Sequence, residues 1–134
     1  MAEQLVVTQT LTAEMVDAGA DLLRTLDSNG FNTTAALWLY LESSDSWRLI
    51  IGSPAVEADG PKRVYEKVQK VLSTKRNGVA IGLRDISVVA PNDARLVLLG
   101  RAVKTGSSDI SGIRFSRNTV NGQFIQDAYI YRLS

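Results

Sequence analysis

The chain has 134 residues, of which 45% are hydrophobic and 22% are charged, and its formal net charge is +1. These values are ordinary for a globular protein, and the length suits a single domain over residues 1–134. There is no cysteine and no histidine, which excludes disulfides, thiolate metal sites, cysteine nucleophiles and Ser-His-Asp triads.

The first ten residues, MAEQLVVTQT, carry an acid where a signal peptide has its basic leader. The longest apolar run, AALWLYL at 35–41, is far shorter than the ~20 residues that span a bilayer. We therefore expect a cytoplasmic protein without membrane contact. GSSDISG at 106–112 lacks the glycine spacing and the Lys-Ser/Thr of a phosphate-binding loop, and we predict neither a cofactor nor a resident metal ion.

The first predicted helix lies between Thr12 and the pair Asn29-Gly30, after a short extended segment at 5–10. Thr12 is the expected N-cap, and apolar residues recur behind it at helical spacing. Asn-Gly is typical of a helix end.

Two strands joined by a polar turn are predicted in TAALWLYLESSDSWRLIIGSP, residues 34–54. If Glu42 pairs with Trp47, both faces of this hairpin are apolar, so the strands should be central and covered on both sides. One face carries Trp38, Tyr40, Trp47, Leu49 and Ile51, and the other carries Leu37, Leu39, Leu41 and Ile50.

A second helix is predicted over 59–76, DGPKRVYEKVQKVLSTKR, with Pro61 at its first position. Its apolar residues recur at helical spacing: Val64, Tyr65, Val68, Val71 and Leu72.

The segment 84–91 has the composition of a strand, and 92–106 that of a third helix. We expect Asn92 or Asp93 to cap this helix and Gly106 to end it.

The C-terminal segment 112–133 predicts a hairpin that turns at Asn121-Gly122, so that Val120 pairs with Gln123. One face, expected to be buried, carries Ile113, Phe115, Phe124, Ala128 and Ile130. The opposite face carries Arg114, Ser116, Asn118, Asp127, Tyr129 and Tyr131.

The order αββαβαββ predicts an α/β domain, bordering on α+β, with a mixed sheet of about five strands and helices packed on it. Right-handed helical crossovers would make the second, third and fourth strands mutually parallel, with antiparallel partners from the two hairpins.

Charge is unevenly distributed along the chain. Residues 1–59 hold nine acids and two bases, a net charge of −7, whereas residues 60–134 hold thirteen bases and five acids, a net charge of +8. Such asymmetry is a hint of binding to nucleic acid, a membrane or the surface of a partner.

The strongest local concentration of positive charge is at the start of the second helix. There the helix dipole destabilises each cation by ~0.3–1 kcal/mol. A bound anion would reverse that sign, since helix N-termini bind anions. The alternatives are a solvated face, neutralised locally by Glu57 and Asp59, or a basic helix that complements an acidic first helix. The predicted anion-binding residues are Gly60, Lys62, Arg63, Lys67 and Lys70.

Two sets of aromatic residues can be considered as stacking platforms for nucleic acid. Trp38, Tyr40 and Trp47 have apolar neighbours, which favours core packing. Tyr129 and Tyr131 lie on the polar face of the last hairpin, where Arg114 can form a cation–π pair with Tyr129. The alternative for them is an amphipathic sheet face covered by a helix.

The second candidate site is a polar cluster on the same hairpin face. Ser116 lies opposite Asp127 in the predicted register, and Arg114 lies diagonally from that acid. The cluster can grip a small polar ligand or support hydroxyl chemistry with Asp127 as base; the interpretation we favour is a cross-strand polar network. Its members are Arg114, Ser116, Asn118, Asp127 and Tyr129.

These patterns favour a non-enzymatic binding or assembly module whose basic C-terminal half contacts an anionic partner. That partner would be an acidic protein surface, including a second copy of the chain, or else nucleic acid. The alternative is a small enzyme that uses Asp127 with Ser116, Arg114 or a tyrosine.

Overall fold

The computed structural model describes residues 10–74 and 81–134. The predicted order of helices and strands is confirmed, with a short additional helix α2 and a short 3-10 helix η1. The predicted extended segment at 5–10 lies outside the described residues except for its last position. In chain order the elements are α1 (Ala13–Ser28), β1 (Ala35–Leu41), β2 (Ser46–Gly52), α2 (Ala55–Asp59), α3 (Pro61–Thr74), η1 (Leu83–Asp85), β3 (Ile86–Val89), α4 (Ala94–Gly100), β4 (Ile113–Val120) and β5 (Gln123–Leu133).

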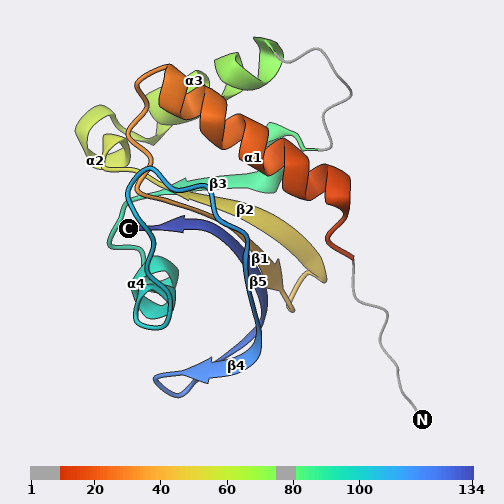
Figure 1. Cartoon of the computed structure of the whole chain (residues 1–134). Helices are drawn as coiled ribbons and strands as arrows, with labels where there is room; N and C mark the ends of the chain where they lie inside the picture. Colours follow the sequence, from red (N-terminus) through yellow and green to blue (C-terminus); the bar gives the residue numbers. More distant parts are fainter. Residues whose placement is uncertain (1–9, 75–80) are drawn as a thin grey trace.

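The five strands form one mixed sheet in the order β3-β2-β1-β5-β4. The β2–β3 pair is parallel, and the other three pairs are antiparallel. Helices α1 and α3 cover one face of the sheet, and α4 lies against the other (Figure 1). The α/β class and the mixed five-stranded sheet are therefore confirmed.

The predicted direction of β4 is wrong. Because β5 is antiparallel to β1, it runs in the same direction as β2 and β3, and β4 runs the opposite way. The connection after α4 explains this direction, since it lies along the end of β5. There Thr105 N donates to Leu133 O at 2.8 Å and Ser111 N donates to Tyr131 O at 2.7 Å. The chain therefore enters β4 beside the carboxyl end of β5.

The capping residue and the end predicted for the first helix are both found in α1. Thr12 Oγ1 accepts a hydrogen bond from Met15 N at 3.1 Å, which confirms the N-cap. The helix ends at Ser28, and Gly30 follows with a left-handed φ of 75°.

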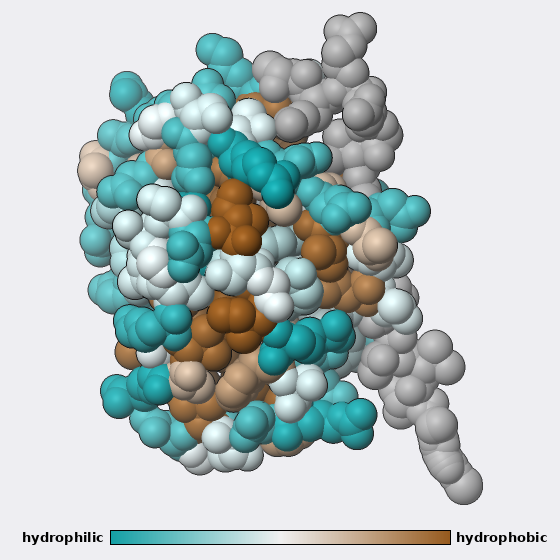
Figure 2. Space-filling view, viewed as in Figure 1, coloured by the Kyte–Doolittle hydropathy of each residue, from teal (hydrophilic) through white to brown (hydrophobic). Residues whose placement is uncertain are grey.

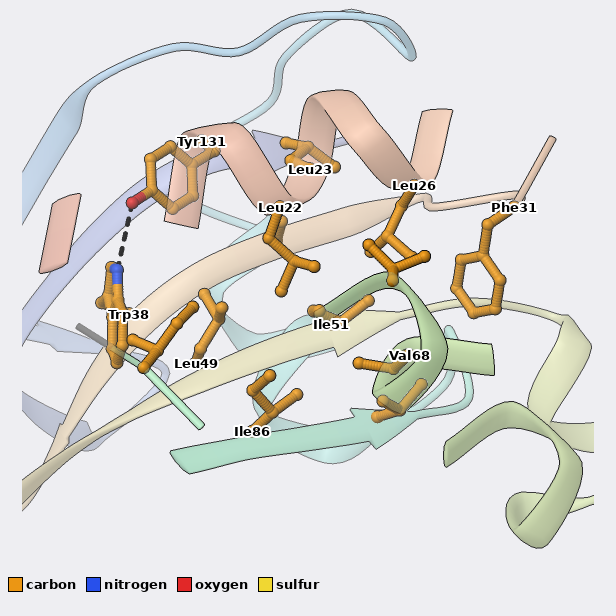
Figure 3. Close-up of a cluster of buried hydrophobic side chains, with 14 of the residues drawn as sticks. Leu22, Leu23, Leu26, Phe31, Trp38, Leu49, Ile51, Val68, Ile86 and Tyr131 are labelled. Atoms are coloured by element: carbon orange, nitrogen blue, oxygen red, sulfur yellow. Dashed lines mark hydrogen bonds between the residues drawn. The ribbon is translucent and has the colours of Figure 1, made fainter. Parts of the chain in front are cut away.

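The register of β1 and β2 differs from the predicted one, because Tyr40 and not Glu42 is paired with Trp47. A shift of two residues keeps every side chain on its predicted face. Both faces are accordingly buried, as expected for central strands. Trp38, Leu49 and Ile51 pack under α1 and α3 (Figure 3), whereas Leu37, Leu39 and Ile50 pack on the α4 side.

Two helix boundaries differ from their predictions. Gly60, with φ of 88°, separates α2 from α3, so the basic helix begins at Pro61; residues 75–76 of its predicted range lie outside the described part. The helix α4 is capped by Asp93 but ends at Gly100 instead of near Gly106. Glycine is a weak helix former, and the chain beyond it turns to join the end of β5.

The last hairpin has the predicted register, with Val120 opposite Gln123 and Ser116 opposite Asp127. Its turn residues have φ values of 49° and 78°, as a type I′ turn requires. Phe124, expected to be buried, is 57% exposed, whereas Ile125 packs on the α4 side. Arg117, with a left-handed φ of 46°, interrupts the alternation of faces between the two ends of the hairpin.

The α4 side of the molecule has the thinner cover. Figure 2, viewed like Figure 1 with α1 and α3 above the sheet and α4 below it, shows apolar side chains that reach the surface between hydrophilic ones. Within residues 10–74 and 81–134, no helix is long and apolar enough to cross a membrane.

Arg132 is buried, with 1% of its surface exposed, although the sequence pattern marked it only as the end of a strand. Its Nη2 and Nη1 donate to the Asp27 carboxylate at 2.9 and 3.1 Å. Nη1 also donates to Thr33 O at 3.0 Å, and Nε donates to Asp109 O at 2.9 Å. One guanidinium therefore joins the last turn of α1, the segment before β1 and the loop before β4.

We expect Asp27→Ala to lower the free energy of unfolding by about 3 kcal/mol, because it leaves a buried guanidinium without its carboxylate. Urea denaturation followed by circular dichroism measures this loss. Asp21→Ala is the matched control on the same helix: its partner Arg24 is exposed, so the expected loss is below about 1 kcal/mol. Equal losses in the two variants would contradict the stabilising role of Arg132.

A second buried contact fixes α1 on the sheet. Tyr131 Oη donates to Val16 O at 2.6 Å and accepts from Trp38 Nε1 at 3.0 Å (Figure 3). Gly19 lies directly above this pair: a Cβ there would overlap the Tyr131 hydroxyl and approach Trp38 Nε1 to 2.9 Å. A glycine in the middle of this helix is thus required by close packing.

We expect Gly19→Ala to destabilise the protein by about 2–3 kcal/mol, through overpacking and loss of the Trp38–Tyr131 hydrogen bond. The sign is the reverse of the usual helical preference for alanine. Gly100→Ala is the control, because a Cβ there meets nothing closer than 3.7 Å, and it should be neutral or slightly stabilising. Thermal unfolding of both variants checks the difference; a stable Gly19→Ala protein would rule out the close approach.

Candidate functional site: the basic face of α3

The position of α3 on the sheet determines where its cations lie. Val64, Val68 and Val71 are buried under the helix, and Tyr65 Oη accepts a hydrogen bond from Val88 N at 2.9 Å. This packing turns the opposite side of the helix to solvent. We call the exposed cations there the basic face of α3: Lys62, Arg63, Lys67 and Lys70.

Three of these cations form one stripe, because Arg63, Lys67 and Lys70 are spaced i, i+4, i+7. Lys67 Nζ lies 3.2 Å from Asp59 Oδ2. In the described part of the chain, no ion pair joins Lys62, Arg63 or Lys70 to a carboxylate. Only Lys67 thus has a close carboxylate partner among the described residues, while the exposed Glu66, one helical turn from both Arg63 and Lys70, offsets part of the positive charge of the stripe.

The acidic helix α1 lies beside α3 (Figure 1) but does not neutralise it. Asp21 pairs with Arg24 in its own helix at 2.9 Å, and Asp27 pairs with Arg132. Among residues 10–74 and 81–134, no ion pair connects the two helices. Of the local alternatives, only the contact of Asp59 with Lys67 is formed.

At the start of α3, two backbone positions do not serve as free donors for an anion. Pro61 has no N–H, and the amide of Gly60 donates to Val56 O at 3.1 Å, so neither offers a free donor. The carboxyl end of α2 also lies immediately before α3, and its dipole is negative there. The side-chain cations therefore add to the first-turn amides of Lys62 and Arg63, and the stripe of three cations is the largest concentration of positive charge on this helix.

A half-open groove of about 360 Å³ adjoins the stripe, between the end of α1 and the middle of α3. We call it the α1–α3 groove. Sequence reasoning missed it, because its two walls come from segments that are far apart in the chain. It is lined by Leu26, Asn29, Gly30, Phe31, Lys67, Lys70 and Val71.

The second predicted site, on the last hairpin, contains an ion pair. Arg114 Nε and Nη2 donate to the two oxygens of Asp127, both at 2.6 Å, and this hydrogen bonding raises the pKa of Arg114. Ser116 lies opposite Asp127 but is exposed, and no hydrogen bond joins the two side chains in the described part of the chain. Both carboxylate oxygens thus serve the guanidinium and not the hydroxyl.

The remaining two cluster residues are engaged elsewhere. Asn118 is exposed, and its Oδ1 accepts from Thr119 N at 3.0 Å. The ring of Tyr129 packs edge-to-face on Tyr131, with centroids 5.4 Å apart. The structure therefore brings together Arg114 and Asp127 as a cross-strand pair, but does not gather all five residues around one point.

The aromatic residues are mostly interior. Trp38 and Tyr131 are 0% and 1% exposed, and Tyr131 is covered by α1, in agreement with the alternative of a sheet face covered by a helix. Tyr40 and Trp47 are 7% and 8% exposed and pack edge-to-face. Arg114 lies over the ring of Trp47, 5.6 Å from its centroid, and not over Tyr129 as expected. These four rings do not offer faces for bases to stack on.

Comparison of the chain with protein-family models, curated proteins and solved structures found no match. The candidate sites therefore rest on the geometry described above.

The Tyr40 hydroxyl provides a test of the hairpin end of the sheet. It donates to Asp45 Oδ1 at 2.5 Å, and this hydrogen bond raises the pKa of Tyr40 to about 12. The pKa of Tyr40 in the folded protein lies above the ordinary value of ~10. The hydrogen bond therefore stabilises the folded protein fully below pH ~10, and this stabilisation is lost as the pH rises toward 12. In a tyrosinate absorbance titration, Tyr40→Phe should remove a component with its midpoint near pH 12. If the component removed has its midpoint near pH 10, the hydrogen bond is absent in solution.

Proposed function

We propose that this protein is a non-enzymatic binding module that contacts an anionic protein surface through the basic face of α3. The observation that supports this most directly is the exposed stripe of Arg63, Lys67 and Lys70, in which only Lys67 has a carboxylate partner among the described residues. The three cations carry like charge on one side of the helix, offset there only in part by Glu66 and Asp59, and an acidic partner relieves the remaining repulsion.

A protein partner is favoured over single-stranded nucleic acid. Proteins that bind single strands combine cations with aromatic rings on which bases stack, whereas here Trp38, Tyr40 and Trp47 are buried. A second copy of the chain is included among the protein partners, because Glu14 and Asp17 are exposed on α1 and can face the basic helix of another molecule.

The enzyme alternative has weaker support. A general base must reach the proton that it removes, and both oxygens of Asp127 already accept hydrogen bonds from Arg114. Asp127 is in this geometry a partner for arginine on the surface of the sheet.

Reversal of charge on the basic face tests the proposal. We expect the double variant Arg63→Glu, Lys70→Glu to bind a fluorescent Glu-rich peptide roughly tenfold or more weakly than the unaltered protein, because repulsion replaces attraction. Fluorescence anisotropy across a salt series measures the affinity, which should fall as salt screens the charges.

The matched control is Arg101→Glu, Lys104→Glu, which makes the same change in net charge at exposed residues next to α4. This variant should keep most of the affinity for the peptide. An equal loss of affinity in both double variants would mean that only the net charge of the protein matters, against a site on α3. Absence of peptide binding at low salt would refute the proposal. Tighter binding of a single-stranded DNA oligonucleotide than of the peptide would overturn the choice of a protein partner.

A further inference from the structure

We propose that the α1–α3 groove binds an apolar side chain from an acidic peptide segment of the partner. The carboxylates of that segment would form ion pairs with Lys67 and Lys70. This inference rests on the function proposed above and narrows its partner to a segment in which a hydrophobic residue is flanked by acids. The recognised segment thus combines two features, one for each part of the site.

The floor of the groove is apolar and already formed. Leu26 is 1% exposed, and Phe31 and Val71 are each 8% exposed, so all three belong to the core as well as to the groove. Figure 3 shows Leu26 and Phe31 beside Val68, in the layer between α1 and α3. The volume of about 360 Å³ lies near the lower end of the roughly 300–1,000 Å³ usual for ligand pockets. One large apolar side chain is an appropriate occupant.

The two walls of the groove differ in charge. Lys67 and Lys70 form the α3 wall, whereas the α1 wall consists of Asn29 and Gly30, which carry no charge. The two lysines are one helical turn apart, with Cβ atoms about 5–6 Å from each other. Carboxylates spaced i, i+4 on a helix, or i, i+2 on an extended segment, match that separation.

The α1 wall also leaves room for a peptide backbone. Gly30 has a φ of 75°, and nothing lies within 4 Å of the position that a Cβ would occupy. A neighbouring chain can therefore approach the main chain closely at this point. A free phosphate would use the lysines but would leave the apolar floor uncovered, so the whole site fits a peptide better than a small anion.

Asp59 occupies part of this site in the unbound protein. Its carboxylate lies 3.2 Å from Lys67 Nζ, where the partner's acid would bind. The two carboxylates compete for one ammonium group, and removal of the internal one should favour the partner. We expect Asp59→Asn to tighten binding of a Glu-rich peptide about two- to fivefold, the range that an exposed ion pair supports.

The experiment uses two synthetic Glu-rich peptides that differ only at one central position, leucine or alanine. Each is titrated into isotope-labelled protein, and the amide NMR signals are followed. The leucine peptide should bind about tenfold more tightly, because its larger side chain leaves water. The signals of Asn29, Gly30, Phe31 and Val71 should shift.

Gly30→Asn tests the mouth of the groove, since asparagine tolerates a left-handed backbone and adds a side chain there. This variant should weaken the leucine peptide at least severalfold. Gly122→Asn is the matched control: it has a similar φ of 78°, also with open space around it, but lies in the hairpin turn. It should bind like the unaltered protein, and thermal unfolding of both variants verifies that each is folded.

The possible outcomes separate the two proposals. Equal affinity for the leucine and alanine peptides, with shifts confined to the basic face of α3, would overturn the groove inference and leave the binding function intact. No binding of either peptide would overturn both. A folded Gly30→Asn protein with undiminished affinity for the leucine peptide would also contradict the groove as the binding place.

Discussion

Arg132 places a full positive charge in the interior of the protein, and such a charge persists there only when acceptors surround it. The Asp27 carboxylate and two backbone carbonyls provide them, and in doing so they hold the end of α1 against β5. Asp27 lies next to Leu26 and two residues before Asn29. Leu26 and Asn29 both line the α1–α3 groove. The position of that groove thus depends on a salt bridge whose own purpose is structural.

The charge asymmetry between the halves of the chain has a different meaning once the protein is folded. Two cations of the basic half serve as partners for carboxylates: Arg132 for Asp27, and Arg114 for Asp127. Neither pair creates a binding surface, because the positive charge of each arginine is met by a carboxylate of the protein itself. The positive charge that remains concentrated lies on the basic face of α3. The candidate binding surface is therefore one side of one helix and not half of the chain.

The polar residues of the last hairpin form a cross-strand pair of the kind that the favoured interpretation of the sequence expected. The Asn121-Gly122 turn placed Ser116 opposite Asp127, as the structure also does. Arg114 then takes both carboxylate oxygens and lies over the ring of Trp47, closing the end of the aromatic layer. An ion pair that uses both carboxylate oxygens stabilises a sheet surface and leaves little of Asp127 for a ligand.

The sequence by itself determined the features that arise from neighbouring residues. The Thr12 cap, the faces of β1 and β2 and the register of the last hairpin follow from side-chain chemistry and periodicity over a few positions. Only the tertiary structure decided the direction of β4, the burial of Arg132 and the existence of the α1–α3 groove. Each of these joins segments distant in the chain, such as Asp27 and Arg132, and no local pattern of residues specifies which distant surfaces will meet.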